Sequence, residues 1–167
     1  LAVREINTGL LAAPACALRR WLAALRNDNS QREYYLTDCV AAAVRDGLSV
    51  AAVVAPTWAE VLGINDKVQL AEAETTLRRW RAADLMLAGV TVADPARLDV
   101  RGSVEHGRDV FLDVNVVLSG RIRLGDGVRI GAHASVLGFN HNSEDHTRPI
   151  WQQGVSAMGI VIGDDVW

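Results

Sequence analysis

Cysteine and positive charge are both scarce in this sequence, and each scarcity removes a class of protein. Only Cys16 and Cys39 occur among 167 residues. With no second pair of cysteines and no histidine at ligand spacing, neither a disulfide framework nor a zinc site is indicated. We expect Cys16 and Cys39 to be buried apolar thiols. Seventeen Lys and Arg against twenty Asp and Glu leave no broad basic surface, so nucleic acid is not an expected partner.

Long apolar runs are also missing. None approaches the roughly 20 residues that a membrane-spanning helix requires. The opening LAVREINTG lacks the apolar stretch of a secretory signal. We therefore expect a cytoplasmic protein with no membrane partner.

Apolar residues make up 50% of the chain, enough for a sizeable core. The first part has an α/β pattern. An amphipathic helix is predicted from the spacing of Leu18, Trp21, Leu22 and Leu25. A second helix can begin at Thr37 or Asp38 and stop before Gly47, and the apolar run from Val50 to Val54 then predicts a buried strand.

A long helix is predicted from Asn65 to Ala88, a segment rich in Ala, Leu, Glu and Arg, with Gly89 as its stop. The side chains expected to pack from it are Val68, Ala71, Leu77, Trp80 and Leu87.

Aliphatic residues then recur every six positions. One series is Leu98, Val104, Val110, Val116, Ile122 and Val128, extended by Ala134; a second is Val100, Leu112, Leu118, Leu124, Ile130 and Val136, with His106 as its exception. Period two within each hexad indicates strands. The repeat of six, with Gly107, Gly125 and Gly131 at one turn position, predicts a parallel β-helix whose coils share an apolar interior.

The six-residue period breaks after Val136 and resumes out of phase at Ile160 and Val166. Residues 138–159 between them are rich in Asn, Asp, His, Pro and Gln, so we expect a loop that leaves the β-helix and returns at GIVIGDDVW. The pattern opens inside one element at Leu1 and stops inside another at Trp167. We therefore expect a fragment of a longer protein.

Three segments carry a family resemblance: REINTG at 4–9, EYYLTD at 33–38 and GINDKVQLAEAE at 63–74. With the hexads as far as Gly131, they resemble the bifunctional N-acetylglucosamine-1-phosphate uridyltransferases/glucosamine-1-phosphate N-acetyltransferases. The resemblance implies that residues 1–64 are the C-terminal part of a uridyltransferase domain, 65–89 a linker helix, and 90–167 a left-handed β-helix of the acyltransferase type with an extruded loop at 138–159.

The tail from 132 to 167 instead resembles hexapeptide acyltransferases of the maltose and galactoside acetyltransferase type. A natural relative, a recombined gene and an artificial chimera are all compatible with this change.

Several site residues follow from the family resemblance. It implies that Asn7 contacts the sugar nucleotide, although Asn7 could equally be a turn residue before Gly9. Asn65 would bind both Mg²⁺ and the sugar nucleotide, or would simply cap the long helix. Glu33, Tyr35 and Thr37 would border the sugar pocket, with a core aromatic for Tyr35 and an N-cap for Thr37 as the structural alternatives.

In the tail, the acyltransferase resemblance makes His141 a general base that takes the proton from an acceptor hydroxyl as it attacks acetyl-CoA. The alternative is a solvated loop histidine. Trp167 would lie near the bound coenzyme.

Three functions remain open. The first is a fragment, incomplete by itself, of a transferase that makes UDP-N-acetylglucosamine for cell-wall precursors from sugar phosphate, acetyl-CoA and UTP, with Mg²⁺. The second is an O-acetyltransferase that uses acetyl-CoA and His141. The third is a catalytically silent module whose β-helix trimerises, and the resemblance implies a homotrimer for the first two as well.

Overall fold

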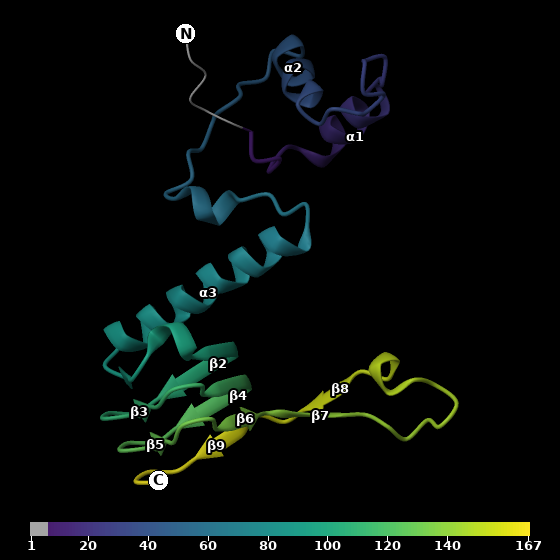
Figure 1. The fold of residues 1–167 in the computed structure, drawn as a ribbon. Helices are drawn as coiled ribbons and strands as arrows, with labels where there is room; N and C mark the ends of the chain where they lie inside the picture. Colours follow the sequence, from purple (N-terminus) through teal and green to yellow (C-terminus); the bar gives the residue numbers. More distant parts are fainter. Residues whose placement is uncertain (1–6) are drawn as a thin grey trace. The chain divides into compact units, whose positions relative to one another are not determined.

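The computed structural model describes residues 7–167, which form a mixed α/β structure with parallel sheets (Figure 1). The chain divides into two compact units, one up to Asn65 and one from Asp66 to Trp167, and each is described by itself. Leu1 and residues 4–6 of the REINTG segment lie outside the described residues. Across residues 7–167, no helix combines the length and apolar character needed to cross a membrane.

Two helices pack together in the first unit. Helix α1 spans Ala15–Ala23 and helix α2 spans Asp38–Arg45, and Trp21, Cys39 and Ala43 form the buried core between them. Both predicted helices are confirmed, including the start of α2 at Asp38 and its end before Gly47. Cys16, expected to be buried, is exposed. It lies five residues before Trp21, so it points roughly 140° away around the helix.

Asp46 joins α1 to the end of α2. Its carboxylate accepts hydrogen bonds from the Trp21 indole at 2.7 Å and from the Arg20 guanidinium at 2.5 Å. These two donors, the indole first, hold the pKa of Asp46 below its usual value. Since an indole buried in a core needs an acceptor, Asp46 completes the packing of Trp21.

The prediction of a buried strand from Val50 to Val54 is wrong. These residues are irregular, and Val53 is 94% exposed. A strand requires a neighbouring strand for its backbone hydrogen bonds, and residues 7–65 contain none. The single further element there is the short 3-10 helix η1, Trp58–Val61.

Helix α3 spans Lys67–Leu87, which confirms the long helix predicted from Asn65 to Ala88, and it lies at the start of the second unit. Asp66 is its N-cap and accepts a bond from the Gln69 N–H at 2.8 Å; Gly89 follows the C-cap with a φ of +102°, which favours glycine. The prediction of which side chains pack from this helix is wrong. All five of them are exposed: Val68, Ala71, Leu77, Trp80 and Leu87. Ala82 and Leu85 are buried instead, since α3 contacts the sheets chiefly through its C-terminal part.

Short strands after α3 stack into two parallel sheets, ordered β1-β3-β5 and β2-β4-β6, with β9 also pairing β4. Their bounds are β1 Thr91–Val92, β2 Asp99–His106, β3 Phe111–Leu112, β4 Val117–Leu124, β5 Arg129–Ile130, β6 Ser135–Leu137 and β9 Ile160–Ile162, with the 3-10 helix η2 at Pro95–Arg97. Val100 pairs with Leu118 and Leu118 with Val136. One coil of the stack therefore takes three hexads.

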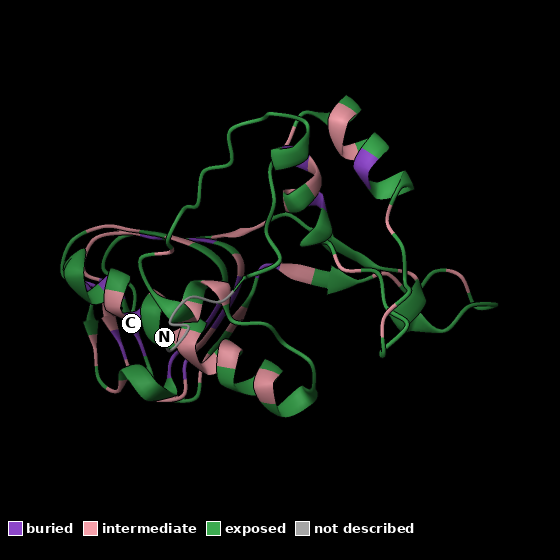
Figure 2. Ribbon diagram, turned by 90° about the horizontal axis from the view of Figure 1, so that it is seen from above, coloured by how far each residue is buried: buried purple, intermediate pink, exposed green. Residues whose placement is uncertain are grey.

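The predicted hexad positions form the core of these coils. Figure 2 shows buried stretches running through the stacked strands. The buried members of the two series are Leu98, Val100, Val110, Leu112, Val116, Leu118, Ile122, Leu124, Val128 and Ile130, while Val104, Ala134 and Val136 are partly buried against them. The six-residue period is confirmed as the period of burial.

A column of glycines marks the corner where the inserted segment leaves. Gly102 and Gly120 pair in register, and Gly120 faces the backbone of Gly138. An added Cβ at Gly102 would lie 2.1 Å from the Gly120 carbonyl oxygen. The Gly159 N–H donates to the Gly138 carbonyl at 3.3 Å, so the segment leaves and re-enters at one point.

The inserted segment is an ordered arm, not only a loop. Strands β7, Phe139–His141, and β8, Val155–Ala157, pair antiparallel, and the 3-10 helix η3, Ile150–Gln152, lies between them (Figure 1). Ile122 on β4 pairs with Ile160 on β9, an offset of 38 residues where neighbouring coils have 18. The extra length equals residues 139–158, which we call the arm.

Candidate functional sites

Asn7 lies on the exposed surface of the first unit. Its side-chain oxygen accepts a hydrogen bond from the Gly9 N–H at 2.8 Å, and Gly9 has a φ of +79°. This is the turn geometry weighed as the structural alternative. The side-chain amide group stays available as a donor, so the turn orients Asn7 without using all of its bonding capacity.

Glu33, Tyr35 and Thr37 lie in the segment that leads into α2. Asn29 shapes this segment by bonding both the N–H and the carbonyl of Glu33, at 3.2 and 2.6 Å. The Tyr35 hydroxyl donates to Gln31 at 2.7 Å, and Thr37 occupies the N-cap position of α2 without a side-chain capping bond. Among residues 7–65, no hydrogen bond joins Asn7 to these three side chains. Their role as one sugar pocket stays a prediction.

Asn65 immediately precedes the N-cap of α3, and the capping role belongs to Asp66. The suggestion that Asn65 itself caps the helix is therefore wrong. Within the described residues, no group of three or more His, Cys, Asp or Glu side chains is placed to hold a metal ion. One amide oxygen does not make a Mg²⁺ site, which needs several oxygen ligands including carboxylates, so these residues do not fit the metal by themselves.

His141 ends strand β7 of the arm. Its backbone is paired with Val155, and its exposed ring meets the Phe139 ring edge-on, with centroids 5.8 Å apart. His141 thus lies on a strand and not in a loop, while its ring is exposed to solvent, and its role as a general base stays a prediction. The Trp167 side chain is 99% exposed, and its place beside bound coenzyme A stays a prediction.

The rest of the arm is closed by its own polar side chains. The Asp145 carboxylate accepts from the Thr147 hydroxyl at 2.6 Å and from the Thr147 N–H at 2.9 Å, which lowers the pKa of Asp145. The Gln153 amide bonds three backbone groups of the arm, and Asn142 links Gln153 to Ser156. Sequence reasoning did not single out these residues, because nothing in an irregular polar segment shows which side chains meet.

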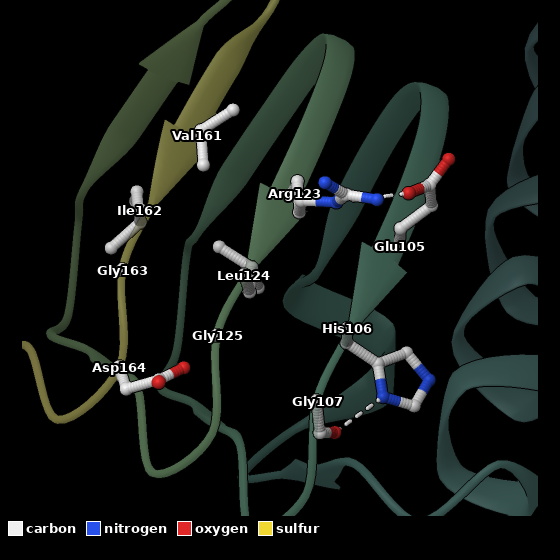
Figure 3. Close-up of a pocket in the computed structure, with 10 residues that line it drawn as sticks. All are labelled: Glu105, His106, Gly107, Arg123, Leu124, Gly125, Val161, Ile162, Gly163 and Asp164. Carbon is white, nitrogen blue, oxygen red and sulfur yellow. Dashed lines mark hydrogen bonds and ion pairs between the residues drawn. The ribbon is translucent and has the colours of Figure 1, made fainter.

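An open pocket of about 320 Å³ lies across the ends of β2, β4 and β9 (Figure 3). Glu105 accepts from Arg123 at 3.2 Å, and the His106 ring bonds the Gly107 carbonyl at 2.9 Å. The same view shows Gly107, Gly125 and Asp164 along the turns below the strands. His106, the exception in the hexad series, is therefore half-buried beside polar groups.

Aspartates at the turns below this pocket connect the coils. Asp126 accepts from the Arg108 N–H at 2.8 Å and from its guanidinium at 3.0 Å, and the Asp126 N–H donates to Asp164 at 2.9 Å. These donors, the Arg108 N–H first, lower the pKa of Asp126. The sequence signal for this contact is the Gly-Asp pair, which occurs at 125–126 and again at 163–164.

These features define a class: a protein whose hexads stack in parallel coils and carry an ordered arm with an exposed histidine. Known proteins place the chain further. It is 57% identical over 135 residues to the bifunctional protein GlmU of Methylibium petroleiphilum, which is 81% of this chain and 29% of that protein. It is 50% identical over 163 residues to GlmU of an Azoarcus species, 96% of this chain and 36% of that protein, and 50% identical over 165 residues to GlmU of a Janthinobacterium species.

No protein-family model matches the chain. At this identity over most of its length, the chain is a homologue of the bifunctional GlmU proteins. It spans about a third of their length.

Proposed function

We propose that this chain is a segment of a bifunctional enzyme that makes UDP-N-acetylglucosamine for cell-wall precursors. Such an enzyme transfers acetyl from acetyl-CoA to glucosamine 1-phosphate, then joins the product to uridylyl from UTP. The observation that carries this proposal is the 50% identity over 98% of the chain to a protein named bifunctional GlmU. The hexad coils after a long helix agree with it.

In this proposal, residues 1–64 belong to the uridyltransferase domain, 65–89 form the linker and 90–167 form the acyltransferase-like part. Asn7 contacts the sugar nucleotide through its free amide donors, and Glu33, Tyr35 and Thr37 border the sugar. Asn65 would contribute one neutral oxygen to the nucleotide and to the Mg²⁺ of the whole enzyme, whose carboxylate ligands the described residues do not supply.

We further propose that the coils wind as a left-handed β-helix and associate as a homotrimer. The 18-residue coils and the exposed apolar side chains on α3 support association. Sedimentation should give a species of three chains that does not change with concentration. An ordered monomer at every concentration would contradict the trimer.

Binding of UDP-N-acetylglucosamine tests the nucleotide-sugar part. We expect weak saturable binding by calorimetric titration, with Asn7→Ala weakening it because the contact to the sugar is lost. Asn27→Ala, another exposed asparagine of the same unit, is the matched control and should bind as the unchanged chain does. Equal binding by both variants, or none by the unchanged chain, would count against this role of Asn7.

A second candidate function is O-acetyl transfer, favoured by the placement of His141 on an ordered strand of the arm. His141 would accept the proton of an acceptor hydroxyl while the oxygen attacks the thioester carbonyl of acetyl-CoA. The carbon–sulfur bond breaks, the acetyl group stays on the acceptor oxygen, and protonated His141 gives its proton to the sulfur, so that coenzyme A leaves as the thiol. The test is the release of free thiol from acetyl-CoA in the presence of a hydroxyl acceptor. Loss of this release in His141→Gln but not in His146→Gln would support the acyl-transfer function. A catalytically silent module would release no thiol.

A further inference from the structure

One amide side chain, that of Gln153, bonds three backbone groups in the turn of the arm. Gln153 is half-buried, and its Nε2 donates to the carbonyls of Asp145 at 2.8 Å and Arg148 at 2.9 Å. Its Oε1 accepts from the Asp145 N–H at 3.1 Å. A primary amide has two N–H donors and one oxygen acceptor, so Gln153 engages every one of these groups with backbone across the arm.

The same residue reaches the strand that carries His141. The Gln153 backbone carbonyl accepts from the Asn142 side chain at 3.3 Å, and the Asn142 backbone N–H donates to the Gly154 carbonyl at 3.2 Å. The Asn142 oxygen in turn accepts from the Ser156 hydroxyl at 2.7 Å, on the partner strand β8. Asn142 directly follows His141, so these bonds fix the end of β7.

We propose that Gln153 is a positioning residue for His141. Its side chain fixes the turn of the arm at Asp145 and Arg148, and this holds its own backbone carbonyl against Asn142, which in turn fixes the direction in which the His141 ring leaves β7. The catalytic purpose of this role rests on the acyl-transfer function proposed above. The contacts by which Gln153 positions His141 do not depend on that function. A general base gains its effect from geometry, since proton transfer needs the base within hydrogen-bond reach of the acceptor hydroxyl.

The test replaces Gln153 by the nearly isosteric glutamate. In Gln153→Glu a carboxylate oxygen faces the carbonyls of Asp145 and Arg148, so two hydrogen bonds become repulsive contacts. The matched control is Gln152→Glu, the same change one residue earlier, where the side chain is exposed and the hydrogen bonds are made by the backbone N–H and carbonyl. Gln153→Met, of similar length without polar atoms, is the second variant.

We expect amide exchange at Asn142 and Asp145 to accelerate about tenfold in Gln153→Glu and Gln153→Met. The ring signals of His141 in a proton–carbon NMR spectrum should shift as its contact with Phe139 loosens. Gln152→Glu should change neither, and β4 should stay protected in all three variants. Lowering the pH to about 4 should partly restore protection in Gln153→Glu alone, because a protonated glutamate regains one donor.

Unchanged His141 signals in both Gln153 variants would overturn the positioning role. Shifted signals in a chain that releases no thiol from acetyl-CoA would keep the positioning role and refute the acyl-transfer function. If transfer occurs, Gln153→Glu should lower kcat with little change in KM for acetyl-CoA, whereas an equal kcat for Gln152→Glu and Gln153→Glu would again overturn the role.

Discussion

Neighbouring residues on β4 experience opposite environments. Ile122 is 2% exposed inside the coils, while Arg121 faces solvent. Ile122→Asp would bury an unpaired carboxylate, so we expect the free energy of unfolding of the coils to fall by about 4 kcal/mol. Arg121→Asp should change it by less than about 0.5 kcal/mol. Urea unfolding of both variants checks this, and equal losses would refute the six-residue period.

Gly102 is constrained by both its conformation and its neighbour. Its φ is +142°, and an added Cβ would lie 2.1 Å from the carbonyl oxygen of Gly120. Gly102→Ala must therefore displace backbone, and we expect a loss of about 2 kcal/mol or more in urea unfolding. Gly131→Ala is the control, because nothing lies within 4 Å of its Cβ position. Similar unfolding curves for the two variants would show that the glycine column is not required.

Asp126 should make the stability of the coils depend on acid. Its folded-state pKa lies below the ordinary value of 3.8, so the unfolded chain takes up a proton first as the pH falls. The stabilisation is thus complete above that value and is lost as the pH falls through the lower folded-state pKa.

Asp126→Asn keeps the oxygen acceptor but removes the charge beside Arg108. We expect the unchanged chain to be more stable than this variant at neutral pH, and the difference to shrink when urea unfolding is repeated at about pH 3. Glu144→Gln serves as a control, because Glu144 is exposed on the arm and the described residues provide no ion pair for it. A gap between Asp126→Asn and the unchanged chain that is constant with pH would exclude the charge as its cause.

At the scale of elements, the arm is separable from the coils. Removal of residues 139–158 joins Gly138 to Gly159. It restores the 18-residue offset between Ile122 and its partner on β9, Ile160. We expect the shortened chain to melt within about 5 °C of the intact one, with the amides of β9 still protected from exchange. Removal of residues 140–158 leaves one residue more and should expose the core face of β9, because a one-residue shift reverses every side chain. If the two deletions behave alike, the register described for β9 is wrong.

The three helices were predicted from their local patterns, whereas the packing of the coils was predicted because their partners repeat along the chain. Hexad positions such as Val116 and Leu118 are buried by the equivalent residues of neighbouring coils, so periodicity alone identified them. The prediction of a strand from Val50 to Val54 failed because an apolar run indicates burial but does not show whether a neighbouring strand exists. The predicted burial of Val68 and Trp80 failed for a related reason. Helix periodicity does not show how much of a helix packs against other elements.

The candidate site divides in the same way. The histidine of the arm came from its segment's resemblance to acyltransferases, which predicted a residue type and a place. The contacts of Gln153 and Asp126 join residues that only the folded chain brings together. Side-chain hydrogen bonds of this kind have no period, so the sequence does not predict them.

At the scale of the whole molecule, the chain spans about a third of its GlmU relatives. A whole-enzyme activity must therefore be tested in a whole enzyme. The suitable recipient is GlmU of Methylibium petroleiphilum, which is 57% identical over the shared 135 residues. Its matching segment can be replaced by residues 1–131 of this chain, with Asn7→Ala and Asn27→Ala versions of the same replacement beside it.

Pyrophosphate release from UTP and N-acetylglucosamine 1-phosphate by these hybrids tests the proposed function most directly. We expect the hybrid and its Asn27→Ala version to release pyrophosphate within about tenfold of the recipient enzyme's rate, and Asn7→Ala to lose most of that rate, about 2 kcal/mol of transition-state stabilisation or more. The chain alone should release none. A soluble, folded hybrid that releases no pyrophosphate would contradict the assignment of this chain to a UDP-N-acetylglucosamine-forming enzyme.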